Sequence, residues 1–252
     1  MSSLSPELAL GTANIVVTLA DNKYFLAHRL ATWGVGAPTL ESAVACTAIA
    51  QEEAGHARVL YSLLEDFPRT VAPLPLERED DRERKYALSY LLEPTTSFVR
   101  GVAALTLADR ALSVLLRAAT ESTLDGLRKR AVRILADESF HQRYADGRVR
   151  ELADSPAFQR EFAALLPETL CWFGPEGELG LALLVDAGIV SQRNEELRQT
   201  FLGSLGALVD KTGVELPVAP GDDGKWTYPE LPWSEWNSLE RRLTASPAPA
   251  TS

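Results

Sequence analysis

The sequence is short of the residue types that mark several classes of protein. It has 2 cysteines, Cys46 and Cys171, far apart and inside apolar stretches. A structural disulfide is therefore not expected, and both are predicted to be buried thiols of a protein in the reducing cytoplasm. Positive charge is also scarce, because 25 Lys and Arg residues stand against 35 Asp and Glu, for a net charge of −10. That balance argues against a nucleic-acid partner, since binding to phosphates needs clustered positive side chains.

Long apolar runs are absent as well. No stretch approaches the roughly 18 apolar residues of a membrane-spanning helix, so no membrane association is expected. The first residues lack the layout of a secretory signal peptide. Alternation of apolar and polar residues is not visible along the chain, so no β-strand is predicted.

What the sequence has instead is a helical pattern. Runs rich in Ala, Leu, Glu and Arg carry apolar residues three and four apart, and Gly and Pro gather in the segments between them. Ser5-Pro6 and Ser155-Pro156 each have the form of an N-cap followed by a helix-starting proline, and Thr39 can cap another helix. Helices are predicted over residues 6–33, 39–66, 95–121, 124–153, 156–173, 179–191 and 193–213. Four of them are roughly thirty residues long, which indicates an all-α fold, a four-helix bundle with additional C-terminal helices.

The last part of the chain has a different composition. We expect residues 1–216 to form the helical domain and residues 217–252, rich in proline, to form an irregular arm. Three tryptophans of the arm are expected to pin it onto the helical body: Trp226, Trp233 and Trp236. The last ten residues are predicted to be disordered because of their low complexity. Residues 77–84 are predicted to be a solvated connector between two helical hairpins.

Histidine is scarce, and its placement is informative. The chain has 3 histidines, of which His28 is predicted to be structural. The other two close the same short motif, Glu53-x-x-His56 and Glu138-x-x-His141. Residues i and i+3 share a helix face, so each glutamate and histidine project side by side. A carboxylate and an imidazole converging in this way form half of a transition-metal site.

Both motifs lie within apolar stripes, which predicts that they face the bundle interior. A buried carboxylate needs a positive partner. Asp109 interrupts the apolar stripe of the helix that precedes Glu138, and Lys23 interrupts the stripe that precedes Glu53. Dimetal carboxylate proteins of the ferritin-like class have one carboxylate on each of two helices and Glu-x-x-His on the other two. The predicted bundle has this layout, with Lys23 in place of one carboxylate.

At these residues the chain resembles the phenylacetic acid catabolic protein family, the ferritin-like subunits of bacterial phenylacetyl-CoA epoxidase, and the catalytic subunit most of all. The resemblance covers roughly residues 15–240. The segments that carry it are residues 37–40, 53–56, 138–143, 173–175, 194–199 and 233–236.

The resemblance implies a di-iron centre that activates O2 and inserts one oxygen atom into the aromatic ring of a CoA thioester. It implies electrons from a separate reductase and a second ferritin-like subunit, usually metal-free, as scaffold. The positions that match its metal ligands are Glu53, His56, Asp109, Glu138 and His141, and Lys23 stands where the family has its first glutamate. Glu53 and Glu138 are the catalytic candidates, with Lys23 modulating them.

Lys23 changes the charge balance of the expected site. Three carboxylates and one ammonium sum to −2, which one divalent ion balances and which two would turn into +2. Three states therefore stay open: one metal with protonated Lys23, no metal with Lys23 paired to carboxylates, or two metals with a neutral or carbamylated Lys23. The cofactor is expected to be one or two ions, with iron first and another transition metal as the alternative.

Three functions follow from these states. The first is a di-iron monooxygenase component, and the second is a non-catalytic, metal-poor scaffold subunit; metal storage is the least favoured. The arm suggests a homodimer, or a heteromer with a second ferritin-like subunit, and an acyl-CoA substrate would need basic groups near the entrance. Candidates for that role are Arg58, Arg143 and Arg148, while Glu52 and Asp137 are assigned either to support of the ligands or to the surface.

Overall fold

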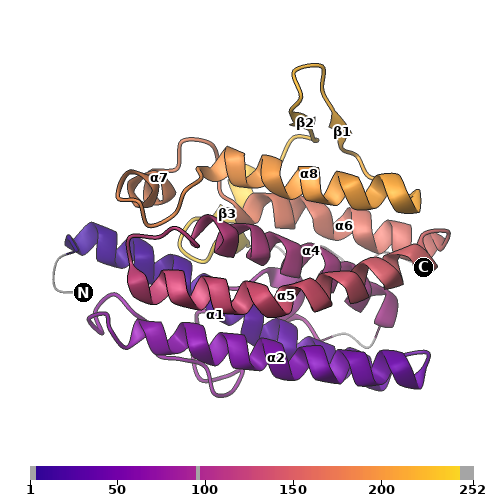
Figure 1. Ribbon diagram of the computed structural model, residues 1–252, viewed down its shortest axis with the longest axis horizontal. Helices are drawn as coiled ribbons and strands as arrows, with labels where there is room; N and C mark the ends of the chain where they lie inside the picture. The colour runs from indigo at the N-terminus through magenta and orange to yellow at the C-terminus, as the bar shows by residue number, and fades with distance from the viewer. Residues whose placement is uncertain (1–3, 95–96, 245–252) are drawn as a thin grey trace.

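Four long helices, packed side by side, form the centre of the fold (Figure 1). The computed structural model describes residues 4–94 and 97–244. The bundle consists of α1 (Pro6–Val35), α2 (Leu40–Leu64), α4 (Phe98–Ala118) and α5 (Asp125–Leu152). The remaining helices are α3 (Ser89–Leu92), α6 (Pro156–Trp172), α7 (Leu179–Asp186) and α8 (Asn194–Thr212). The predicted all-α bundle with additional helices is confirmed.

The helix starts follow the predicted capping chemistry. The side chains of Ser5, Thr39 and Ser155 accept hydrogen bonds from the amide nitrogens of Leu8, Ser42 and Phe158. These bonds satisfy amides that have no partner inside the first helical turn. Six of the seven predicted helices match observed ones to within about four residues at each end. The helix predicted over 179–191 ends earlier, at Asp186, and α3 was not predicted because four residues show no periodicity.

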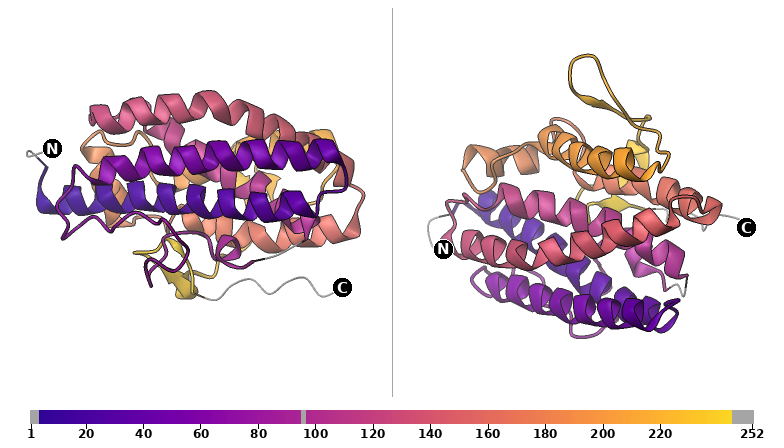
Figure 2. Two further views of the ribbon diagram at one scale, coloured as in Figure 1. Left: turned by 90° about the horizontal axis from the view of Figure 1, so that it is seen from below. Right: turned by 45° about the vertical axis from the view of Figure 1, so that its right-hand side comes forward.

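Helix α4 lies deepest in the molecule. Almost every one of its residues is buried, because α1 and α5 pack on one side and α6 and α8 on the other (Figures 1 and 2). A helix that is apolar nearly all round is expected to be buried in this way. By contrast, α2 is the outermost helix of the bundle and packs mainly against α1, with its other side toward α5 and solvent. Within the described residues no helix is long and apolar enough to cross a membrane.

The prediction of no β-strand was wrong in one region. The arm contains two short antiparallel pairs, β1 (Ala219–Pro220) with β2 (Trp226–Thr227) and β3 (Trp236–Asn237) with β4 (Arg242–Leu243). Two-residue strands are too short to show an alternating pattern, so the sequence carries no signal for them. Of the last ten residues, predicted to be disordered, 245–252 lie outside the described residues.

The arm is held against the helical body as expected. Trp226 packs so closely on α8 that a Cβ on Gly206 would lie 2.0 Å from its ring. The guanidinium of Arg198 stacks on Trp233, and that of Arg241 stacks on Trp236. The tryptophans predicted to pin the arm therefore do so.

The connector over residues 77–84 is less solvated than predicted. Arg82 reaches inward and forms an ion pair with Asp21, a fully buried residue of α1. The same carboxylate accepts a 2.7 Å hydrogen bond from the Tyr61 hydroxyl and a 2.9 Å bond from the Tyr86 amide. Asp21 therefore ties the connector to the bundle, because a buried carboxylate needs several donors.

Candidate metal centre

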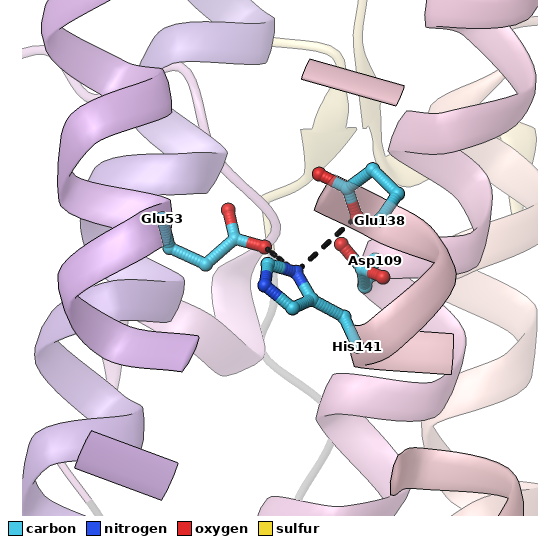
Figure 3. A group of neighbouring side chains, drawn as sticks. All are labelled: Glu53, Asp109, Glu138 and His141. Carbon is cyan, nitrogen blue, oxygen red and sulfur yellow. Dashed lines mark hydrogen bonds and ion pairs between the residues drawn. The ribbon is translucent and has the colours of Figure 1, made fainter. Parts of the chain in front are cut away.

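The predicted site residues converge in the middle of the bundle. Lys23 lies on α1, Asp109 on α4, and the two motifs on α2 and α5. Figure 3 shows four of these side chains, Glu53, Asp109, Glu138 and His141, pointing toward one another. All six side chains are buried: Lys23, Glu53, His56, Asp109, Glu138 and His141. These six residues are called the central cluster below. The expectation that the motif stripes face inward is confirmed.

Lys23 occupies the meeting point of the carboxylates. Its Nζ lies 2.9 Å from Glu53 Oε1, 2.7 Å from Asp109 Oδ1 and 2.7 Å from Glu138 Oε1. Each partner comes from a different helix, so the ammonium links α1 to α2, α4 and α5 at once. An ammonium has three donors, and all three are used.

His141 is held at both ring nitrogens. Its Nδ1 lies 3.0 Å from Glu53 Oε1 and 3.4 Å from Glu138 Oε2, and its Nε2 lies 2.7 Å from Glu52 Oε2. This ring is fully buried, while Glu52 is partly exposed. The contact assigns Glu52 to support of a ligand candidate, a question that sequence spacing left open.

His56 makes the reciprocal contacts and is held less fully. Its Nε2 lies 3.2 Å from Asp137 Oδ2, while its Nδ1 lies 3.3 Å from Glu138 Oε1 without forming a hydrogen bond. Each motif histidine is thus bonded by the acidic residue that precedes the glutamate of the other motif. Such contacts fix the orientation of a ligand ring.

Two further residues complete the description. Ser113, one helical turn after Asp109, points its Oγ at Glu138 Oε2 at 3.5 Å. Sequence reasoning did not find Ser113, although a polar residue four positions after Asp109 on a buried helix is a usable signal. His28 lies outside the central cluster, half exposed, with its ring 4.3 Å from that of Tyr24.

The charges of the central cluster depend on Lys23. Burial alone would lower the pKa of Lys23, but Asp109, Glu138 and Glu53 together hold it well above the ordinary value. Burial would raise the pKa of Glu53, and the Lys23 ammonium reverses this and brings it to about 2. The pKa of Glu138 is lowered in the same way, with Lys23 again outweighing burial. Lys23 therefore acts as a permanent internal cation.

The pKa values of the remaining three groups, Asp109, His56 and His141, are also shifted by burial and by the neighbouring charges. Burial and the neighbouring Glu138 raise the pKa of Asp109 well above its ordinary value, despite Lys23. For the histidines burial is outweighed by Glu138 and Glu53, which raise the pKa of His56 to about 9 and that of His141 to about 11. Without a metal, protons therefore balance the carboxylates.

The donor set fits a transition-metal ion. Glu53 Oε2, His56 Nδ1 and Asp109 Oδ2 are buried and have no hydrogen-bond partner. One ligand atom from each of Glu53, Asp109, Glu138 and His141 lies within 4.8 Å of the others. Three carboxylates and one imidazole suit iron, manganese or zinc. His56 lies outside this group of four, so the two motifs are not equivalent.

A cavity of about 510 Å³ reaches the central cluster from outside, between α2 and α5. Its lining residues are Glu52, Gly55, His56, Arg58, Val59, Ser62, Arg133, Ile134 and Asp137. Of the three arginines considered for an acyl-CoA, Arg58 lines this cavity. Arg148 instead bonds Ser42 and pairs with Glu151, and Arg143 is exposed elsewhere on α5.

Comparison with known proteins identifies a family and a relative. The sequence model of the phenylacetic acid catabolic protein family matches residues 7–245. One of the subunits of 1,2-phenylacetyl-CoA epoxidase from Escherichia coli (strain K12) is 28% identical over 224 residues. That alignment covers 82% of this chain and 70% of the relative. The matched range contains the whole central cluster and, apart from Pro6 at the start of α1, all four bundle helices.

Proposed function

The chain belongs to the phenylacetic acid catabolic protein family, and from that premise we propose that it is a component of an epoxidase-type oxygenase. In this proposal its centre pairs one divalent metal ion with the Lys23 ammonium. The proposed ion is iron. The proposed substrate is an aromatic acyl thioester, by analogy with the Escherichia coli relative, whose name specifies phenylacetyl-CoA.

One observation carries the proposal: the Lys23 ammonium bonds all three carboxylates of the central cluster. Protonated Lys23 and three ionised carboxylates sum to −2, which one divalent ion neutralises. Two divalent ions would leave an uncompensated charge of +2, which costs several kcal/mol in a buried site. The charge balance therefore favours one divalent ion over a pair.

The residues of the chain have separate tasks in this centre. Glu53, Asp109, Glu138 and His141 would hold the ion. A bound iron ion supplies the activation of O2. Lys23 keeps one oxygen of each carboxylate in place, Glu52 fixes the ring of His141, and the buried surroundings exclude water. Glu53 and Glu138 are the catalytic candidates of this proposal.

A metal-free scaffold subunit is the second candidate function. It is favoured by the three hydrogen bonds of Lys23, which leave this ammonium no unused donor. The raised pKa values of His56 and His141 add two positive side chains at neutral pH. Together with the Lys23 ammonium they offset the negative charge of the carboxylates, so the cluster does not need an ion for its charge balance.

Metal analysis separates the two candidates. The wild type and Lys23→Glu are loaded with ferrous iron without oxygen, desalted and analysed for iron per chain. We expect about one equivalent in the wild type and about two in Lys23→Glu, where the fourth carboxylate balances the second ion. Lys129→Glu, a change at an exposed lysine, is the matched control. Two irons in the wild type would contradict the proposal, and none would favour the scaffold.

The proposal also includes partners. The relative is one subunit of an epoxidase, and we expect this chain to join a second ferritin-like subunit and to receive electrons from a reductase. A homodimer is the alternative assembly. The two free thiols, both buried, suit the cytoplasmic location that we propose.

A further inference from the structure

The cavity between α2 and α5 is rimmed by positive charge that the protein leaves unneutralised. Arg58 and Arg133 line it, both exposed, and neither forms an ion pair or a hydrogen bond within the described residues. Twelve other arginines of this acidic chain form ion pairs elsewhere among the described residues. Six further arginines also lack an ion pair within the described residues: Arg69, Arg117, Arg130, Arg143, Arg150 and Arg160. Arg58 and Arg133 differ from these in that both line this one cavity.

A third arginine is fixed beside them with its charge also unpaired. Arg130 donates from Nε to the Val59 carbonyl oxygen at 2.8 Å and from Nη1 to the Gly126 carbonyl oxygen at 3.0 Å. Its Nη2 donates to Ser62 Oγ at 3.0 Å. All three acceptors are uncharged, and two of them belong to residues that line the cavity. Arg130 is thus held in position at the rim without a carboxylate.

The acidic residues of the lining bond to histidines and not to these arginines. Glu52 accepts from His141 Nε2 at 2.7 Å, and Asp137 lies 3.2 Å from His56 Nε2. Both carboxylates therefore face the histidines of the central cluster. Three guanidinium groups remain for whatever enters the cavity.

The wall of the cavity is also shaped to leave room. Gly55 lies in the interior of α2, where a glycine costs about 1 kcal/mol relative to alanine. A Cβ added there would meet no atom within 4 Å, so packing inside the chain does not require the glycine. Its absence of a side chain keeps the cavity open next to His56.

We infer that this cavity binds the oxyanion of a small molecule, a phosphate or a carboxylate group, through Arg58 and Arg133, with Arg130 adding charge at the rim. Guanidinium groups match both anions in geometry and charge. A volume of about 510 Å³ is within the range of small-molecule sites. The inference rests on the cavity alone and does not depend on the metal content of the central cluster.

Titration calorimetry at constant ionic strength tests the site, with inorganic phosphate and benzoate as separate probes of the full chain. We expect at least one probe to bind the wild type, and Arg58→Gln and Arg133→Gln each to weaken it roughly tenfold. The matched control is Arg150→Gln on α5, an exposed arginine without an ion pair, which should bind like the wild type. The probe that binds more tightly shows whether the site prefers a phosphate or a carboxylate group.

A second variant tests the cavity without removing charge. Gly55→Leu places a side chain in open space and should abolish binding, while thermal unfolding shows whether the variant is folded. If it fails to fold, the two arginine variants still decide. The inference is wrong if neither probe binds the wild type, or if Arg150→Gln weakens binding as much as the rim variants do.

Discussion

The two hairpins of the bundle contribute the same number of side chains to the central cluster, but the surroundings of these side chains differ. The α1–α2 hairpin contributes Lys23 with Glu53 and His56, and the α4–α5 hairpin contributes Asp109 with a second Glu-x-x-His motif. The two hairpins differ in the charge of one residue, which is positive at Lys23 and belongs to an acid at Asp109. The second hairpin supplies a carboxylate where the first supplies the cation that binds it, at 2.7 Å from Asp109.

The hairpins also differ in how they enclose their histidines. His141 is fully buried and bonded at both ring nitrogens. His56 lines the outer cavity, and its Nδ1 has no hydrogen-bond partner. The comparison teaches that the α4–α5 hairpin encloses its histidine and supplies three of the four grouped ligand candidates, whereas the α1–α2 hairpin leaves its histidine at the cavity and supplies the cation.

The largest expected effect comes from removing that cation. Lys23→Met keeps an unbranched side chain one atom shorter than lysine and leaves three buried carboxyl groups without the ammonium between them. We expect the metal-free protein to lose about 3–5 kcal/mol of unfolding free energy, as when one partner of a buried ion pair is removed. Denaturant unfolding at pH 7, after treatment with a chelator, measures the loss.

The control for this prediction is an exposed lysine. Lys129→Met removes an ion pair with Asp125 on the surface of α5. Such pairs contribute at most about 1 kcal/mol, so this variant should unfold close to the wild type. Equal stability of the Lys23 and Lys129 variants would show that the ammonium is not needed to hold the two hairpins together.

The next effect distinguishes the two histidines as ligands. His141 belongs to the group of four residues whose ligand atoms lie within 4.8 Å of one another, and His56 does not. We expect His141→Ala to weaken iron binding at least a hundredfold, about 2.7 kcal/mol. His56→Ala should change it by less than about tenfold, or roughly 1.4 kcal/mol.

Competition with a chromophoric chelator measures both affinities. Circular dichroism of each variant confirms that the helices remain. If the two alanine variants lose affinity equally, the motifs are equivalent ligands, and the asymmetry argued from the geometry is wrong.

A smaller effect is expected from the acidic residues that support the histidines. Glu52 bonds His141 at 2.7 Å, and Asp137 lies 3.2 Å from His56. Glu52→Gln should weaken iron binding by roughly 10–100-fold, because it loosens the orientation of a ligand ring. Asp137→Asn should weaken it less than about threefold, since the ring that it supports lies outside the group of four. The same competition assay measures the iron affinity of both variants. A larger loss of affinity in Asp137→Asn than in Glu52→Gln would show that His56, and not His141, is the more important ligand.

Sequence reasoning predicted the part of this site that depends on helical spacing. Two motifs on apolar stripes, with Asp109 and Lys23 at matching offsets, were enough to bring six side chains together. The crossed contacts of Glu52 with His141 and of Asp137 with His56 could not be predicted, because they depend on how α2 and α5 are aligned. That alignment results from packing between helices, which no local pattern encodes.

Two other features were also beyond the sequence, for a related reason. The cavity beside His56 is lined by Gly55, where an added Cβ would meet no atom within 4 Å, and a helical glycine in a sequence does not reveal what lies opposite it. The paired strands of the arm are two residues long, below the length at which alternation is detectable. Periodicity therefore predicts which face of a helix is buried, and tertiary packing decides what each face meets.

The smallest expected effect concerns the cavity beside α2 and tests whether this cavity is open in solution. Gly55 on α2 and Gly147 on α5 are both helix-interior glycines at which an added Cβ meets no atom within 4 Å. Each change to alanine should stabilise the protein by about 0.5–1 kcal/mol, because alanine has the higher helix propensity and restricts the unfolded chain. Thermal or denaturant unfolding of the two variants measures this. A gain at Gly147 with a loss at Gly55 would mean that α2 closes on the cavity in solution, and the α1–α2 side would then be as enclosed as its counterpart.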